Sequence, residues 1–322
     1  MKRRVLKIGA FFMSIAMLLC GLAACDVVDK AKNFVEEKKN MIVHFRDVSG
    51  YYTEEEAASF TAAAQEKAGS GMIVAIGGGF DTQERFRPLI DICIEHTGKT
   101  NPKLLFMPTA HRDELEEKEE IIEWFEAAGC TSDVLLVSQS TKEEVAEKIA
   151  AADIIYETGG NLKFLTENWK EKGVYEEVKK AFDGGAALIG PSSGAMCWAQ
   201  KGWDDCGDEV FRITDSFPFL GKDASYDYYD CAGLLPFCIC PHFDNIAWRV
   251  YAFKALKLDI PSLCIENGAA VVYANGSYKV VSDEATPKRK AYLFYPDRKI
   301  VMMNVKEKTE FLNIVDGECR SK

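Results

Sequence analysis

Histidine and basic residues are scarce in this 322-residue chain, which has four histidines and only 39 lysines and arginines against 50 aspartates and glutamates. The formal net charge of −11 argues against nucleic acid or an anionic lipid surface as the main partner, because both attract basic patches. The sequence also has no internal repeat and no low-complexity tract. Its 48% of hydrophobic residues is an ordinary globular composition, and the length is sufficient for a substantial core.

The longest hydrophobic run, residues 8–24, is too short to span a membrane comfortably. It follows four basic residues and ends in Leu-Ala-Ala-Cys25, which resembles the bacterial lipobox, in which the cysteine is lipidated. We therefore predict a signal peptide over residues 1–24 and an exported, cell-surface or membrane-anchored lipoprotein held by a lipid on Cys25. The alternatives are an ordinary signal peptide, or a cytoplasmic protein if this N-terminus is not a working signal.

Nine of the eleven cysteines follow Cys25, and several stand inside apolar runs such as LLPFCIC. An odd number in such settings indicates small buried hydrophobic side chains rather than a disulfide framework. Cys238, Cys240 and His242 raise the possibility of a metal site, but the alternating C-I-C is typical of one face of a strand. We predict no metal and no cofactor.

The pattern changes along the chain at Met72. Residues 25–71 are interpreted as a tether with one helix, and residues 72–322 as the catalytic domain. From residue 72 to about 190, five short apolar strands alternate with amphipathic helices, which predicts an α/β fold with a doubly wound, mostly parallel sheet and helices on both faces. Residues 202–235 have no clear period, and the short strands after them are expected to extend or cap the sheet.

The stretch GPSSG at residues 190–194 follows the last of these five strands and precedes a helix-compatible segment. This is the setting of a nucleophile elbow, in which Ser192 would project beyond the end of the strand. The N–H of Ser193, at the start of the following helix, would face a developing oxyanion. The alternative is a small-residue loop between a strand and a helix.

A nucleophilic serine needs a base, and the four histidines differ in their settings. His44 lies outside the α/β region, and His96 lies within a predicted helix. His111 and His242 both follow predicted strands, where ligands bind in parallel sheets, and position alone does not choose between them.

Three motifs together resemble the dipeptidase E and cyanophycinase family of serine peptidases. They are Gly159-Gly160-Asn161, Gly190-x-Ser192-x-Gly194-Ala195 and Pro241-His242-Phe243, and the likeness extends from about Met72 to about Tyr273. The resemblance implies a three-layer fold similar to class I glutamine amidotransferases, with a serine in place of their cysteine.

The resemblance also implies roles for individual residues. Ser192 would be the nucleophile and His242 the base, with the N–H groups of Gly160 and Ser193 as the oxyanion hole. Asn161 would help to shape the substrate pocket. The acidic member of the triad best matches Asp215, and its rivals are Asp227, Asp230 and Asp244.

The function that follows is a serine peptidase that hydrolyses short peptides, with aspartyl bonds as the preference implied by the family. Arg249 would pair with a substrate carboxylate, and a surface salt bridge is its alternative. A first rival function is an α/β-hydrolase esterase, although only 50 residues separate Ser192 from His242 and no H-G-G-G motif occurs. A second is an inactive peptide-binding surface lipoprotein on the same fold. A glutamine amidotransferase is disfavoured, because it would carry cysteine at position 192.

Overall fold

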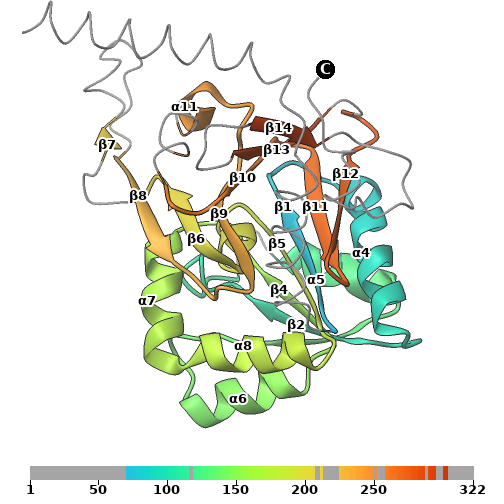
Figure 1. Cartoon of the computed structure of the whole chain (residues 1–322). Helices are drawn as coiled ribbons and strands as arrows, with labels where there is room; N and C mark the ends of the chain where they lie inside the picture. Colours follow the sequence, from blue (N-terminus) through green and yellow to red (C-terminus); the bar gives the residue numbers. More distant parts are fainter. Residues whose placement is uncertain are drawn as a thin grey trace, which may run out of the picture. The chain divides into compact units, whose positions relative to one another are not determined.

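The computed structural model describes residues 70–303, apart from 116–118, 207–210, 213–224, 250, 252–254, 256–257, 287–288 and 295–299 (Figure 1). The predicted signal peptide, Cys25 and the tether helix therefore lie outside the described residues, as does Asp215. Within the described part of the chain, no helix combines the length and hydropathy needed to cross a membrane.

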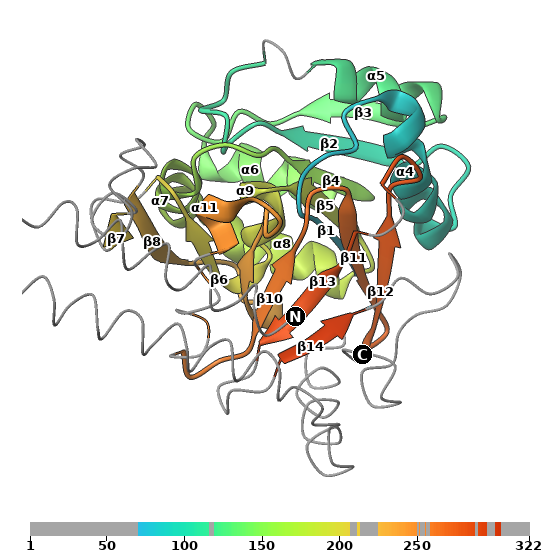
Figure 2. The same ribbon diagram turned by 90° about the horizontal axis from the view of Figure 1, so that it is seen from above.

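A seven-stranded sheet carries the alternating region, in the order β12-β11-β1-β5-β4-β2-β3. Its strands can be followed from β3 to β12 in Figure 2. The five strands from β1 to β5 pair in parallel, and β11 joins β1 in antiparallel orientation with β12 beyond it. Their bounds are Met72–Ile76 (β1), Lys103–Met107 (β2), Thr131–Val134 (β3), Ile154–Glu157 (β4), Ala187–Pro191 (β5), Ala269–Ala274 (β11) and Ser277–Ser282 (β12).

Helices cover both faces of this sheet, which confirms the predicted doubly wound arrangement. Alternate residues of β1 point to opposite sides, so that Val74 packs with the side chains of α4 and α5 and Ile73 with those of α6, α7 and α8. The bounds are Gln83–Thr97 (α4), Glu119–Ala127 (α5), Lys142–Ala150 (α6), Leu162–Lys172 (α7) and Val174–Asp183 (α8). Two helices, α7 and α8, lie between β4 and β5, and they part at Gly173.

A second group of strands has the order β14-β13-β10-β9-β6-β8-β7. Its bounds are Ala199–Asp204 (β6), Phe211–Arg212 (β7), Ser225–Asp230 (β8), Leu235–Cys240 (β9), Ser262–Ile265 (β10), Ala291–Phe294 (β13) and Ile300–Met303 (β14). Of the C-terminal strands, β11 and β12 extend the first sheet as expected, whereas β10, β13 and β14 belong to the second.

The segment without a clear period contributes β6 and β8, which pair in antiparallel orientation. Aromatic side chains stabilise this pair: the ring centroids of Trp203 and Tyr226 lie 5.3 Å apart in a stacked arrangement, and Tyr228 lies 4.8 Å from Trp203. Trp203 and Tyr226 are buried, whereas Tyr228 is partly exposed. Aromatic residues among polar and charged neighbours do not produce a simple alternation, so the sequence pattern did not reveal these strands.

Candidate active site

The carboxyl end of β1 holds three segments that are far apart in the sequence. The carbonyl of Ile76 accepts the N–H of Ser192 at 3.0 Å, and the next carbonyl, of Gly77, accepts the N–H of His242 at 2.9 Å. The carbonyl of Gly78 then accepts the N–H of Gly268 at 2.7 Å. Three successive carbonyl groups therefore bring a serine, a histidine and the loop after β10 to the sheet edge where ligands bind in parallel α/β folds.

Ser192 stands on a sharp turn between β5 and the short helix α9, Ser193–Met196. Its φ of 54° and ψ of −117° are uncommon for a residue with a side chain. A Cβ atom at Gly190 or Gly194 would lie 2.3 or 2.1 Å from the carbonyl oxygen of Glu157, so both flanking glycines are required for the close approach of β4. The arrangement is that of the predicted nucleophile elbow.

His242 meets Ser192 across the end of the sheet. Its Nε2 lies 2.9 Å from the Ser192 hydroxyl, and its Nδ1 lies 2.7 Å from Oδ1 of Asn267. Both side chains are half-buried, which leaves the pair accessible from solvent. Because an amide oxygen can only accept, Nδ1 carries the proton and donates it to Asn267, and Nε2 is free to accept from the serine.

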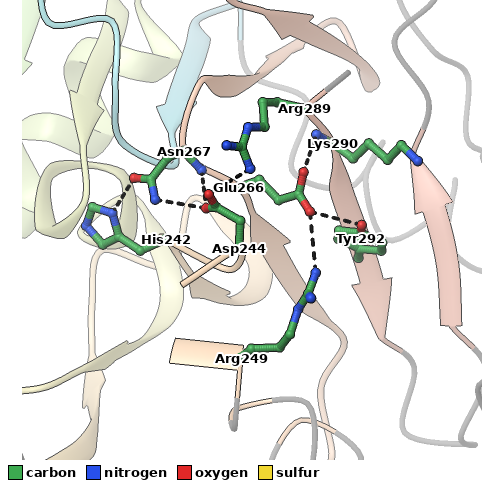
Figure 3. A network of polar contacts seen from close by, with 8 residues as sticks. All are labelled: His242, Asp244, Arg249, Glu266, Asn267, Arg289, Lys290 and Tyr292. Atoms are coloured by element: carbon green, nitrogen blue, oxygen red, sulfur yellow. Dashed lines mark hydrogen bonds and ion pairs between the residues drawn. The ribbon is translucent and has the colours of Figure 1, made fainter. Parts of the chain in front are cut away.

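The residue behind the histidine is therefore an asparagine, and two further side chains stand behind it (Figure 3). Oδ1 of Asp244 accepts from the Asn267 side-chain amide at 2.8 Å and from its backbone N–H at 2.7 Å. Arg289 donates to the other oxygen of Asp244 at 2.8 Å. Asp244, one of the predicted rivals for the acid, thus reaches His242 only through Asn267.

The other candidate acids occupy different places. Asp227 and Asp230 lie on β8, where Asp227 accepts the N–H of Tyr228 and Asp230 pairs with Lys201. Asp215 is outside the described residues, so its assignment stays a prediction. Sequence reasoning missed Asn267. Its available signal was the position of Glu-Asn-Gly directly after the apolar strand Ser262–Ile265, which is the kind of position that supplies site residues in such sheets.

Arg249 lies on the short helix α11, Ile246–Arg249, beside this network. Its guanidinium is 3.6 Å from Glu266 and stands over the ring of Phe243, and 53% of the side chain is exposed. Glu266 also accepts from the backbone N–H of Lys290 and from the hydroxyl of Tyr292. The ion pair is the alternative that the sequence left open for Arg249, and substrate binding by this side chain stays a prediction.

Gly160 and Ser193, the predicted oxyanion hole, are held next to each other. The Ser193 hydroxyl lies 2.8 Å from the carbonyl oxygen of Gly160, and a Cβ atom at Gly159 would lie 3.2 Å from that of Ser192. Among the described residues, neither the N–H of Gly160 nor that of Ser193 has a hydrogen-bond acceptor. Their role as the oxyanion hole stays a prediction.

Two buried acids, Glu157 and Asp204, accept backbone N–H groups from the loops next to Gly160. Oε1 of Glu157 accepts the N–H groups of Ala110 and Thr158, and Oδ2 of Asp204 accepts the N–H of Leu162 at the start of α7. Burial raises the pKa of Glu157 well above its usual range. Burial also raises the pKa of Asp204 to about 7, and the charge of Asp205 adds to the shift.

Several other predicted residues have structural partners. The side-chain oxygen of Asn161 caps α7 by accepting the N–H of Phe164 at 2.8 Å, so its role in a substrate pocket stays a prediction. Cys240 lies opposite Cys264 in the parallel register of β9 and β10, and burial raises the pKa of the Cys240 thiol. In the described part of the chain, no three His, Cys, Asp or Glu side chains are grouped to hold a metal ion.

The fold and this arrangement define a class: a mostly parallel α/β protein with a serine on a nucleophile elbow and a histidine within hydrogen-bonding distance. A model of the family "Peptidase family S51" matches residues 72–281, which is more than half of the chain. The chain therefore belongs to peptidase family S51, the dipeptidase E and cyanophycinase family, as the motifs predicted.

Individual relatives agree with the family. The chain is 26% identical over 221 residues to the "Uncharacterized peptidase YgaJ" of Bacillus subtilis (strain 168), covering 67% of this chain and 89% of that protein. It is 25% identical over 198 residues to the "Uncharacterized peptidase PM1590" of Pasteurella multocida (strain Pm70), covering 59% and 90%. A crystal structure of a peptidase from an acI-B1 Actinobacterium has the same fold, with a TM-score of 0.56 and 19% identity over 74% of this chain and 95% of that one. The family and these relatives support a peptidase function.

The raised pKa of Asp204 predicts a pH dependence of stability. Between about pH 4, where an unfolded aspartate loses its proton, and about pH 7, the folded state binds more protons than the unfolded state. The free energy of unfolding contributed by this group therefore falls as the pH rises, by at most about 1.4 kcal/mol per pH unit.

The variant Asp204→Asn removes this contribution, and urea unfolding at a series of pH values measures it. We expect the variant to lose less stability than the wild type between about pH 4 and 7. Asp81→Asn, which removes a carboxylate that is 75% exposed and pairs with Arg85, is the control and should follow the wild-type curve. Parallel curves for wild type and Asp204→Asn would show that Asp204 is ionised throughout this range.

Proposed function

We propose that the protein is a serine peptidase that hydrolyses short peptides, with Ser192 as nucleophile and His242 as general base. The observation that carries the proposal is the 2.9 Å contact between the Ser192 hydroxyl and Nε2 of His242, with Asn267 on the opposite nitrogen. The nucleophile, the base and a third group that orients the base are the parts that acyl transfer through a serine requires. Family membership supports the same reaction class.

The chemistry follows from the positions of these groups. The Ser192 oxygen attacks the scissile carbonyl carbon as His242 Nε2 takes the hydroxyl proton, and the carbonyl oxygen becomes an oxyanion facing the N–H groups of Gly160 and Ser193. His242 then gives its proton to the leaving amine as the carbon–nitrogen bond breaks. Water, deprotonated in turn by His242, hydrolyses the acyl-enzyme and restores the serine.

Asn267 takes the third place in this proposal. An asparagine that accepts from Nδ1 fixes the imidazole in the tautomer that can act as base, as asparagine does in papain-like proteases. Asp215 would have to displace Asn267 from Nδ1 to act as the orienting acid. Aspartyl bonds are the proposed substrate preference, on the strength of the family resemblance, and Arg249 is the proposed partner of a substrate carboxylate.

The test uses a fluorophosphonate probe and a panel of substrates. The probe should label wild type and Ser193→Ala, in which the backbone N–H is retained, but not Ser192→Ala. Hydrolysis of dipeptides with Asp-X and β-Asp-X members should fall by about 10⁴-fold or more in Ser192→Ala, because nucleophile removal leaves only binding and the oxyanion hole.

The same panel separates the alternative functions. Turnover of p-nitrophenyl esters without any dipeptide hydrolysis would support the esterase. An absence of labelling and turnover in the folded wild type would support the inactive peptide-binding protein and contradict the proposal.

Gly78 provides an independent test, because it packs against the contact between His242 and Asn267. A Cβ atom at this position would lie 2.2 Å from Oδ1 of Asn267 and 2.7 Å from Nδ1 of His242. We expect Gly78→Ala to lower kcat/KM by about 100-fold, because a misplacement of about 1 Å at the reacting groups has this order of effect.

The matched control is Gly98→Ala, which also replaces a glycine of positive φ but meets no atom within 4 Å. Both variants are expected to lose stability from backbone strain, and only Gly78→Ala should lose activity. Equal activity in the two variants, measured below their melting temperatures, would show that the His242–Asn267 contact is not needed for turnover.

A further inference from the structure

The amide of Asn267 can be placed in two orientations that differ only in the exchange of its oxygen and nitrogen. In the observed orientation Oδ1 faces Nδ1 of His242 at 2.7 Å and Nδ2 faces Asp244 at 2.8 Å (Figure 3). The amide oxygen can only accept and the amide nitrogen can only donate. The orientation of this one side chain therefore determines which nitrogen of His242 carries the proton.

The reversed orientation is incompatible with a base at Nε2. With Nδ2 of Asn267 facing the imidazole, Nδ1 would have to be the acceptor, and the proton of the neutral ring would move to Nε2. Nε2 would then point a proton at the Ser192 hydroxyl and would have no lone pair to receive the serine proton. The wrong tautomer of the triad histidine is known to abolish most of the activity of serine proteases that retain their geometry.

Asp244 is the group that distinguishes the two orientations. Its Oδ1 accepts both the side-chain and the backbone N–H of Asn267, so reversal would bring the amide oxygen against a carboxylate oxygen with no proton between them. Asp244 cannot turn away easily, because its other oxygen accepts from Arg289 at 2.8 Å. The side chains of Asp244 and Arg289 are 18% and 36% exposed, so water competes only in part for these contacts.

We propose that Asp244 is a positioning residue that selects the tautomer of His242 through Asn267, with Arg289 holding the carboxylate in place. The inference rests on the proposed function, because a tautomer has a catalytic consequence only if His242 is the base. Glu266, the neighbouring acid, does not share this role, since its contacts are with Lys290, Tyr292 and Arg249.

The test combines kinetics with a direct measurement of the tautomer. ¹⁵N chemical shifts of the imidazole nitrogens distinguish Nδ1–H from Nε2–H, and with four histidines in the chain the His242 signals are assigned by their loss in His242→Gln. We expect wild type to show the Nδ1–H form of the neutral ring. Asp244→Ala should show a mixture of both forms and a kcat lowered by about 10- to 100-fold with little change in KM, the usual loss when the outer partner of a functional histidine is removed.

Asp283→Ala is a matched control for the loss of a carboxylate with the same kinds of partners. Asp283 accepts from the backbone N–H of Ala285 and pairs with Arg85, as Asp244 does with Asn267 and Arg289, but it has no contact with the amide of Asn267. The control should retain the wild-type tautomer and a kcat within about twofold. If Asp244→Ala does not fold, Arg289→Met is measured in its place and should shift the tautomer in the same direction by a smaller amount.

Three results would overturn the inference. One is an Nε2–H tautomer in the wild type, which needs no variant. Another is an unchanged tautomer in the folded Asp244 or Arg289 variant, and the third is an equal loss of kcat in Asp283→Ala. The tautomer readout does not depend on turnover, so an absence of peptidase activity or of fluorophosphonate labelling would contradict the proposed function separately.

Discussion

The arrangement of the site depends on the backbone at the end of β1. Three consecutive carbonyl groups, of Ile76, Gly77 and Gly78, each accept one N–H from a different loop: that of Ser192, of His242 and of Gly268. Backbone hydrogen bonds to the last residue of the buried strand β1 and to the two glycines that follow it fix the relative positions of these loops more firmly than contacts between side chains would. The serine and the histidine are thus anchored at adjacent residues, Ile76 at the end of β1 and Gly77 directly after it.

The same constraint explains where the chain tolerates unusual backbone geometry. Ser192 and His242 both have positive φ, at 54° and 52°, and each is held there by its N–H bond, that of Ser192 to Ile76 and that of His242 to Gly77. The end of β4 approaches the turn at Ser192 so closely that only glycine fits at positions 190 and 194. Strain of this kind persists only when surrounding contacts over-determine it, and it is common at reactive residues.

Much of the fold and part of the site could be predicted from the sequence. Four of the five parallel strands, β1, β2, β4 and β5, are largely buried and read as apolar runs, and the glycines around Ser192 mark the turn, because both features are local in the chain. The edge strand β3, with the sequence TSDV, is only partly buried and has no such pattern. The orienting role of Asn267 has no such local signature, since an amide becomes an orienting group only when the fold carries it to a histidine 25 residues away in the sequence. Asp244 could be named as a candidate acid, but its contact through Asn267 could not be predicted. Two strands of the second sheet, β6 and β8, were hidden for a related reason: the pair is stabilised by aromatic stacking across strands rather than by an alternating pattern.

A crystal structure of the protein after reaction with a phosphonate ester tests the central claim most directly, because the adduct mimics the tetrahedral intermediate. The account predicts phosphorus bonded to the Ser192 oxygen, Nε2 of His242 within about 3 Å of that oxygen, and the phosphoryl oxygen facing the N–H groups of Gly160 and Ser193. Phosphorus on Ser193 or another side chain, or an imidazole turned away from Ser192, would contradict it.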